Sequence, residues 1–253
     1  MTIGSCMSEG ILEAFKKNSQ NLEIHHINHV IHNRSDYFLN CFVKKAQIPV
    51  MPKDIISKVD NIYSEEFPDK DLKSEAEFYL DNQSEIKIGK NRIESRISAI
   101  TNINDALVDI FLLDNFMDIA AMLVHERINS QEYFIFSGAF KPATFNSLYF
   151  WTEYLSEDQS RENWIQIINW LRFKNPQAKI FFTPFPKSVY NHENKPSVLR
   201  ARLFRDKLNY KDFPAIILSA PDVNFESMIS IDDWSHYKPS YYKTIAEQIT
   251  TFL

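Results

Sequence analysis

The sequence predicts an α/β protein in which a mainly parallel sheet is covered by helices on both faces. Short apolar runs of strand length alternate along the chain with helical segments of roughly 10–15 residues. One apolar run, Leu107–Leu113, is almost continuously hydrophobic, which is typical of a strand buried on both faces of a parallel sheet. The length of 253 residues fits one large domain of this class. We therefore expect a single α/β domain over residues 1–253.

The first elements are predicted to be a strand, a tight turn and a helix. Met1–Ile3 is a short apolar run that ends at Gly4, and Met7–Lys17 carries apolar residues at helical spacing. A second strand is expected within Leu22–His32, where alternation is only partial. Residues from about 49 to 100 are rich in Glu, Lys and Asp, and we interpret them as a polar helical insertion or lid.

The second half of the chain continues the alternation. The helix expected at Asn163–Phe173 has an apolar face at Trp164, Ile167, Ile168 and Leu171. The other expected elements, in chain order, are a strand or edge hairpin at Tyr133–Gly138, a strand at Lys179–Thr183, a basic helix at Val198–Leu208, a strand at Ala215–Leu218 and a helix at Tyr241–Phe252.

Composition excludes several classes of protein. A hydrophobic content of 44% is too high for intrinsic disorder, and a net charge of −5 gives no basic excess for nucleic acid. No apolar stretch is long enough for a membrane span, and the N-terminus lacks the pattern of a signal peptide. Two cysteines, Cys6 and Cys41, are compatible with a reducing compartment. We expect a cytoplasmic protein, with its oligomeric state open.

The sequence predicts neither a metal nor a required cofactor. With four glycines in the chain, neither a Gly-x-Gly-x-x-Gly nor a P-loop motif occurs. The histidines at 25, 26, 29 and 32 resemble a metal cluster, but in a strand His25 and His26 point to opposite faces. Arg200 and its basic neighbours could bind an anion or form a solvated helix face.

Polar residues that could carry chemistry stand at the carboxyl ends of the predicted strands, where ligands bind in open α/β sheets. They are Gly4-Ser5-Cys6, Asp114-Asn115, Thr183 and the loop from Asp232 to His236. Cys6 is expected at a helix N-terminus, where free backbone N–H groups favour a thiolate, so it is a candidate nucleophile. Alternatively Cys6 is a small buried hydrophobe. Ser5 is either a competing nucleophile or a helix N-cap.

The loop before the last helix contains a candidate catalytic dyad. Asp233 stands three residues before His236 and could hold the imidazole Nδ1–H, which leaves Nε2 as a base. The alternative is a surface loop with a capping aspartate.

Taken together, Ile3-Gly4-Ser5-Cys6 after the first strand and Asp233-Trp234-Ser235-His236 before the last helix resemble the SGNH/GDSL hydrolase superfamily. The resemblance is to a divergent bacterial branch that has Gly-Ser-Cys in place of Gly-Asp-Ser and is associated with capsule and surface-polysaccharide genes. It implies a three-layer α/β/α sandwich that is SGNH-hydrolase-like (flavodoxin-like). It also implies that Cys6 is the nucleophile, His236 the general base and Asp233 its orienting carboxylate. Asn115 is the candidate donor to the oxyanion, although the glycine of that family motif is missing.

The function implied is acyl transfer by an esterase, thioesterase or O-acyltransferase that acts on a carbohydrate or a thioester. An acyl donor such as a coenzyme A thioester would suit it. The alternative is a catalytically inactive SGNH-like module that binds a glycan or a protein in polysaccharide biosynthesis. A papain-like cysteine peptidase is a third alternative, but the local sequence of that family around its cysteine is absent.

Overall fold

The computed structural model describes the fold over ten segments, and the predicted insertion at about residues 49–100 lies outside them. These segments are residues 1–19, 29–31, 34–44, 103–128, 133–137, 147, 149–187, 196–207, 210–230 and 236–253.

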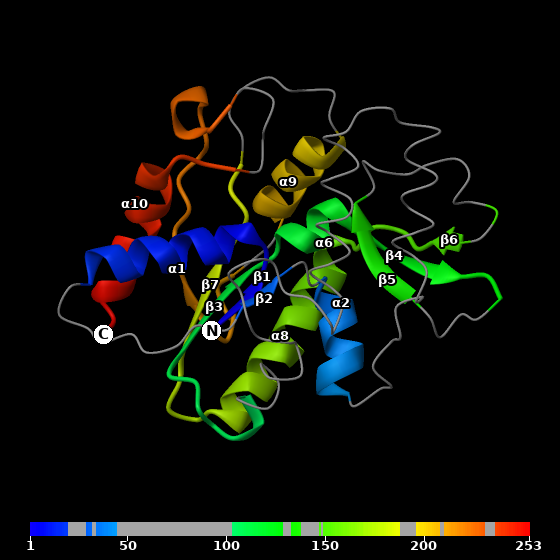
Figure 1. Ribbon diagram of the computed structural model, residues 1–253, viewed down its shortest axis with the longest axis horizontal. Helices are drawn as coiled ribbons and strands as arrows, with labels where there is room; N and C mark the ends of the chain where they lie inside the picture. The colour runs from blue at the N-terminus through cyan, green and yellow to red at the C-terminus, as the bar shows by residue number, and fades with distance from the viewer. Residues whose placement is uncertain are drawn as a thin grey trace.

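The centre of the fold is a parallel sheet of five strands (Figure 1). Its strands are β1 (Thr2–Gly4), β2 (His29–Ile31), β3 (Ile110–Asp114), β7 (Lys179–Thr183) and β8 (Ile216–Ile217). They are ordered β2-β1-β3-β7-β8, and every neighbouring pair is parallel. This confirms the predicted α/β class with a mainly parallel sheet. Strand order reverses at β1, so the connection leaves β1 for β2 on one side and returns to β3 on the other, as in doubly wound sheets.

Helices lie on both faces of this sheet (Figure 1). One face packs against α1 (Cys6–Asn18) and α10 (Pro239–Thr250), which contribute with Leu112 and Phe181 to one apolar cluster. On the other face, Phe111 and Phe182 join a second cluster with α8 (Glu157–Lys174), α2 (Ser35–Phe38) and the π-helix Leu39–Val43. Successive strand residues therefore pack into the apolar clusters on opposite faces of the sheet. This explains why the sequences of these strands are continuous apolar runs.

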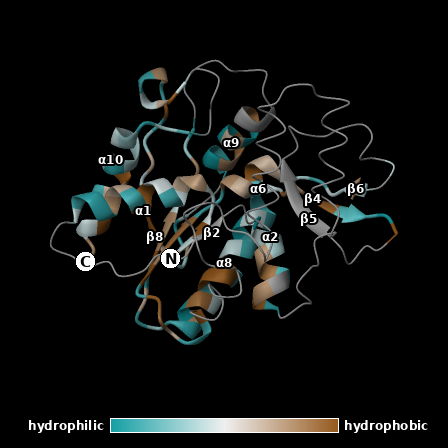
Figure 2. Ribbon diagram, in the orientation of Figure 1, coloured by the Kyte–Doolittle hydropathy of each residue, from teal (hydrophilic) through white to brown (hydrophobic). Residues whose placement is uncertain are grey.

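Helix starts are set by caps that lie outside the apolar stripes. Helix α8 begins at Glu157, six residues before the predicted start, because Ser156 and Gln159 form a reciprocal capping box. Helix α10 begins at Pro239, and α9 (Pro196–Lys207) also begins at a proline, the residue favoured in a first helical turn. Figure 2 shows hydrophobic and hydrophilic residues alternating along α1 and α8, as expected for helices with one buried side.

A smaller antiparallel sheet, which the sequence predicted only in part, follows the short helix α6 (Phe116–Ala120). Its order is β5-β4-β6, with β4 at Ala121–Glu126, β5 at Tyr133–Ser137 and β6 at Tyr149–Trp151. The strand expected at Tyr133–Gly138 is confirmed as β5.

Two arginines fasten the smaller sheet to the rest of the fold through main-chain carbonyl groups. Arg34 is 2% exposed and donates to the carbonyls of Ala121 and Glu153, at 3.2 and 3.1 Å. Its guanidinium also forms a two-point ion pair with Asp36. Arg200 donates to the carbonyls of Asp118, Ile119 and Leu155.

Asp118, on α6, is a fully buried carboxylate between three elements. It accepts hydrogen bonds from Ser35 N (2.7 Å), Ser160 Oγ (2.5 Å) and Trp164 Nε1 (2.9 Å). Burial raises its pKa to about 6, and the hydrogen bonds from Ser160 and Ser35 oppose that rise.

In the part of the chain that the structure describes, no helix is both long and apolar enough to cross a membrane.

Candidate functional site

The site lies where the order of the strands reverses, at the carboxyl ends of β1 and β3. These strands are adjacent and parallel, with Ile3 opposite Leu113. The turn Gly4-Ser5-Cys6 therefore lies beside Asp114 and Asn115. Two of the predicted groups of site residues, more than 100 residues apart in sequence, are thus brought together, at the position where open α/β sheets bind ligands.

Asp114 is the residue that joins the two strand ends. It is fully buried, and its Oδ2 accepts from the backbone N–H groups of Ser5 (2.8 Å) and Ser8 (3.1 Å). Its Oδ1 accepts from Ser5 Oγ (2.9 Å) and Phe116 N (3.0 Å). Burial raises the pKa of Asp114 above its ordinary value, and the hydrogen bonds from Ser5, Ser8 and Phe116 offset part of that rise.

Gly4 allows the turn to approach this carboxylate. Its φ of +148° is a conformation that residues with a side chain rarely adopt. A Cβ atom at Gly4 would lie 2.5 Å from Asp114 Oδ2 and 2.8 Å from the Asp114 carbonyl oxygen. The glycine of the predicted motif is therefore required by the contact between the two strand ends.

Ser5 is the N-cap of α1, which was one of its two predicted roles. Its Oγ accepts from Met7 N at 3.0 Å and donates to Asp114, and the residue is 2% exposed. Both partners of the hydroxyl are internal, and little of it reaches solvent. This geometry favours Cys6 over Ser5 as the nucleophile.

Cys6 is the first residue of α1, and its thiol is free and partly exposed. The following N–H groups of the helix are taken: Met7 N by Ser5 Oγ, Ser8 N by Asp114, and Glu9 N by the Ser5 carbonyl at 3.5 Å. Among the described residues, no acceptor pairs with the Cys6 N–H. One backbone donor thus remains beside the thiol for an incoming oxygen atom.

Cys6 and Asp114 share the N-terminus of α1. The backbone N–H groups of Ser5 and Ser8 already donate to the Asp114 carboxyl group, so these two donors are not available to the Cys6 sulfur. A nucleophilic Cys6 would need a base to take its proton, which is the predicted role of His236.

Asn115 is 1% exposed and links β3 to the segment after β7. Its Oδ1 accepts from Phe185 N at 2.8 Å. Because a backbone N–H can only donate, this bond fixes which end of the amide is oxygen and leaves Nδ2 as the donor. Burial raises the pKa of the Tyr210 hydroxyl, and the Asn115 side chain offsets part of that rise.

His236 lies in the segment that leads into α10, next to a residue that contacts the segment after β7. The adjacent Tyr237 is buried and forms a β-bridge with Met228, and its ring lies 6.2 Å from the ring of Phe185, the residue held by Asn115, at a tilt of 42°. His236 itself is partly exposed, and its carbonyl accepts from Ile229 N. Asp233 lies outside the described residues, so its predicted bond to His236 stays a prediction.

The remaining predicted residues divide into two groups. Thr183 ends β7 directly opposite Asp114 and is 2% exposed. The backbone of His29 lies in β2, whereas His25, His26 and His32 fall outside the described segments. Over the described segments, no group of three or more potential metal ligands occurs. Arg200, a candidate anion-binding residue, instead donates to main-chain carbonyls.

Sequence reasoning missed the function of Asp114 in the turn. Its position directly after a buried strand was a signal that it lies at the ligand-binding edge, but its partners Ser5 and Ser8 are distant in sequence. No family model matches the chain, and no curated protein matches it.

Proposed function

We propose that the protein is an acyl-transfer enzyme, an esterase, thioesterase or O-acyltransferase, with Cys6 as its nucleophile. The observation that carries the proposal is the turn at the β1–β3 edge. There a partly exposed thiol stands at the first residue of α1 beside an N–H group with no acceptor among the described residues. A nucleophile next to a free backbone donor is the arrangement that acyl transfer needs.

The reaction would begin with proton transfer from the Cys6 thiol to Nε2 of His236. The sulfur then attacks the carbonyl carbon of an ester or thioester, and the Cys6 N–H, with Asn115 Nδ2 as a second donor, stabilises the oxyanion. Collapse of this intermediate breaks the bond to the leaving group, which takes the proton from His236, and leaves an acyl group on Cys6. Water or a sugar hydroxyl then attacks the acyl-enzyme and gives its proton to His236, the bond between the carbonyl carbon and the Cys6 sulfur breaks, and His236 returns the proton to the sulfur.

The resemblance to the SGNH/GDSL superfamily supports this proposal on fold as well as on motif. Helices on both faces of a parallel sheet with the strand order β2-β1-β3-β7-β8 are compatible with a three-layer, flavodoxin-like sandwich of that superfamily. In this proposal Asp233 orients His236. The substrate class is an acylated carbohydrate or a thioester, and the setting is cytoplasmic polysaccharide biosynthesis.

The first test follows the pH dependence of Cys6 alkylation by iodoacetamide in a Cys41→Ser background, in which Cys6 is the one thiol that can react. We expect the alkylation rate to rise at lower pH in the parent than in His236→Ala. The second test incubates the protein with p-nitrophenyl acetate. We expect one acetyl group on the peptide that contains Cys6, and none in Cys6→Ala.

Ser5→Ala is the matched control, because it removes the cap hydroxyl and keeps the thiol. Acetylation that survives in Ser5→Ala and is lost in Cys6→Ala supports the proposal. An unreactive Cys6 that is indifferent to His236 would overturn it and favour the binding module.

A further inference from the structure

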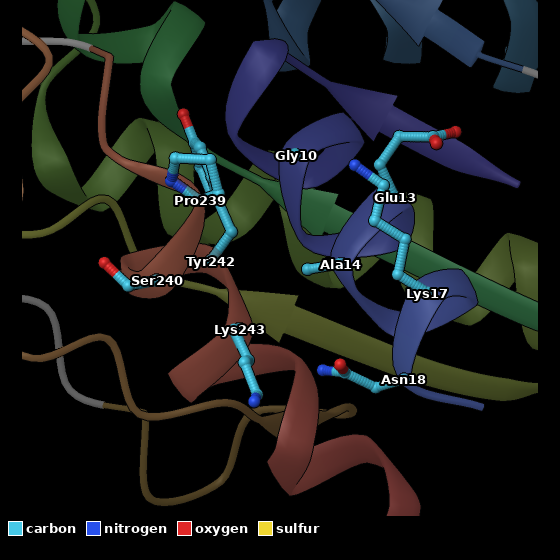
Figure 3. Close-up of a pocket in the computed structure, with 9 residues that line it drawn as sticks. All are labelled: Gly10, Glu13, Ala14, Lys17, Asn18, Pro239, Ser240, Tyr242 and Lys243. Carbon is cyan, nitrogen blue, oxygen red and sulfur yellow. The ribbon is translucent and has the colours of Figure 1, made fainter. Parts of the chain in front are cut away.

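A groove between α1 and α10 begins one helical turn from Cys6. It has a volume of about 310 Å³, near the lower limit for small-ligand sites. Gly10, Ala14 and Lys17 line it from α1, and Tyr242 and Lys243 line it from α10 (Figure 3). The lack of a side chain at Gly10 makes room for the Tyr242 ring, because a Cβ there would lie 2.8 Å from ring carbons.

Cys6 lies on the face of α1 that lines this groove. Residues 6, 10, 13 and 17 follow the spacing i, i+4, i+7 and i+11, which places them along one side of a helix. With a rise of about 1.5 Å per residue, Cys6 and Gly10 are about 6 Å apart along the axis. A substrate with its carbonyl carbon at Cys6 could therefore extend into the groove.

The charges of the groove favour an anion. Lys17 forms no ion pair within the described segments, and Figure 3 shows its side chain running back along α1 toward Gly10. Lys243 meets Glu247 only at 3.8 Å and in an exposed position, where such pairs are weak. Glu13 also lines the groove and meets Lys16 at 3.5 Å in an exposed position, so Lys17 and Lys243 give the lining one more positive than negative charge.

We infer that this groove holds the acyl part of the substrate, and that this acyl part is an apolar chain or ring bearing an anionic group. Ala14 and the Tyr242 ring would contact the apolar body, and the ammonium groups of Lys17 and Lys243 would hold the charge. The inference rests on the proposed function of Cys6, and it narrows the substrate to organic anions of this shape.

The test compares two aromatic disulfides as probes of Cys6: dithiobis(nitrobenzoate), which carries carboxylates, and dithiodipyridine, which is neutral. In each reaction the Cys6 sulfur bonds to one aromatic sulfur while the disulfide breaks and releases the other as a thiolate. Lys17→Gln and Lys243→Gln are compared with the parent in the Cys41→Ser background. We expect the rate with the anionic probe to fall about fivefold or more and the rate with the neutral probe to stay within about twofold.

Lys174→Gln is the control, because it removes one lysine charge from α8, on the other face of the sheet and away from the groove. An equal loss of rate in Lys174→Gln, or no loss in Lys17→Gln, would overturn the inference. Equilibrium binding of anilinonaphthalenesulfonate, an aromatic anion, gives a readout independent of the thiol. Its Kd should rise about fivefold in Lys17→Gln and stay unchanged in Lys174→Gln.

These readouts separate the two proposals. If Cys6 is inert to both disulfides but anion binding still depends on Lys17, the acyl-transfer proposal fails and the anion site stands. If Cys6 reacts with both probes and neither lysine affects rate or Kd, the groove proposal fails alone.

Discussion

The Oδ2 atom of Asp114 occupies the space that a side chain at Gly4 would need, since a Cβ at Gly4 would lie 2.5 Å from it. Two segments separated by more than 100 residues therefore meet at a contact that only glycine permits. The Ser5-Cys6 turn depends on it, because Asp114 holds both Ser5 and Ser8.

Gly4→Ala should destabilise the fold and disturb the turn at Cys6. The substitution combines an unfavourable φ with a clash against buried atoms, which together cost about 2–5 kcal/mol. Urea denaturation measures the change in the free energy of unfolding. A loss below about 1 kcal/mol would show that the turn adapts and that the contact is not required.

Asp114→Asn should move the pH profile of Cys6 alkylation to lower pH. Burial raises the pKa of Asp114 and three backbone N–H groups that donate to it lower that pKa in part; once ionised, this carboxylate opposes formation of a thiolate at the nearby Cys6. Removing that charge should make Cys6 alkylate faster than in the parent at pH values where Asp114 is ionised.

Asp118→Asn is the control for that experiment, since Asp118 is also fully buried and hydrogen-bonded but contacts α2 and α8 instead of the turn. Its alkylation profile should match that of the parent. An equal shift in both variants would mean that general destabilisation, and not the charge of Asp114, is measured.

Asp118 should make the protein more stable at acidic than at neutral pH. Its pKa is about 6 in the fold and 3.8 as the ordinary value, so the folded state keeps a proton that the unfolded state has lost between these values. Its contribution to stability therefore falls as pH rises through this window and is constant above it, a change of about 3 kcal/mol at most.

The stability difference between parent and Asp118→Asn isolates this effect, because other groups titrate in both proteins. Urea denaturation at about pH 4 and about pH 7 measures it. The parent should lose more stability than the variant between the two values. Parallel losses would show that Asp118 does not titrate in this window.

Asn115 can be tested with two substitutions that separate its two roles. Asn115→Asp keeps an acceptor for Phe185 N but removes the Nδ2 donor, whereas Asn115→Ala removes both. If Nδ2 stabilises the oxyanion, both variants should lose on the order of a hundredfold in the rate of acyl transfer. Retained activity in Asn115→Asp alone would assign Asn115 to positioning Phe185. A loss below about threefold in Asn115→Ala would remove it from the site.

The strands of the parallel sheet were predictable because their residues contact two cores at once. Lys179–Thr183 is β7 as predicted. The strand predicted at Leu107–Leu113 is β3 at Ile110–Asp114, because Leu107 is 68% exposed and follows Ala106, whose φ of 56° turns the chain. Hydrophobicity alone did not distinguish that turn from the strand.

The smaller sheet and the Asp114 contacts had no local signal. β4 reads Ala-Met-Leu-Val-His-Glu, and most of these residues favour helices, so its conformation comes from pairing with β5 and β6. Cys6 and Asn115 were predictable as strand-end residues. The way in which Asp114 takes up the neighbouring N–H groups depends on register between distant strands, which the sequence does not display.

The anchoring of the smaller sheet by Arg34 and Arg200 has an evolutionary consequence. Around the smaller sheet their acceptors are the carbonyl oxygens of Ala121, Glu153 and Leu155, and every amino acid presents the same carbonyl. These hydrogen bonds therefore do not depend on which side chains the acceptor residues carry. The buried residues Ala121, Val124 and Tyr149 remain constrained by the apolar cluster that they share with α8, so only the exposed side chains of this sheet can be exchanged without loss of its attachment.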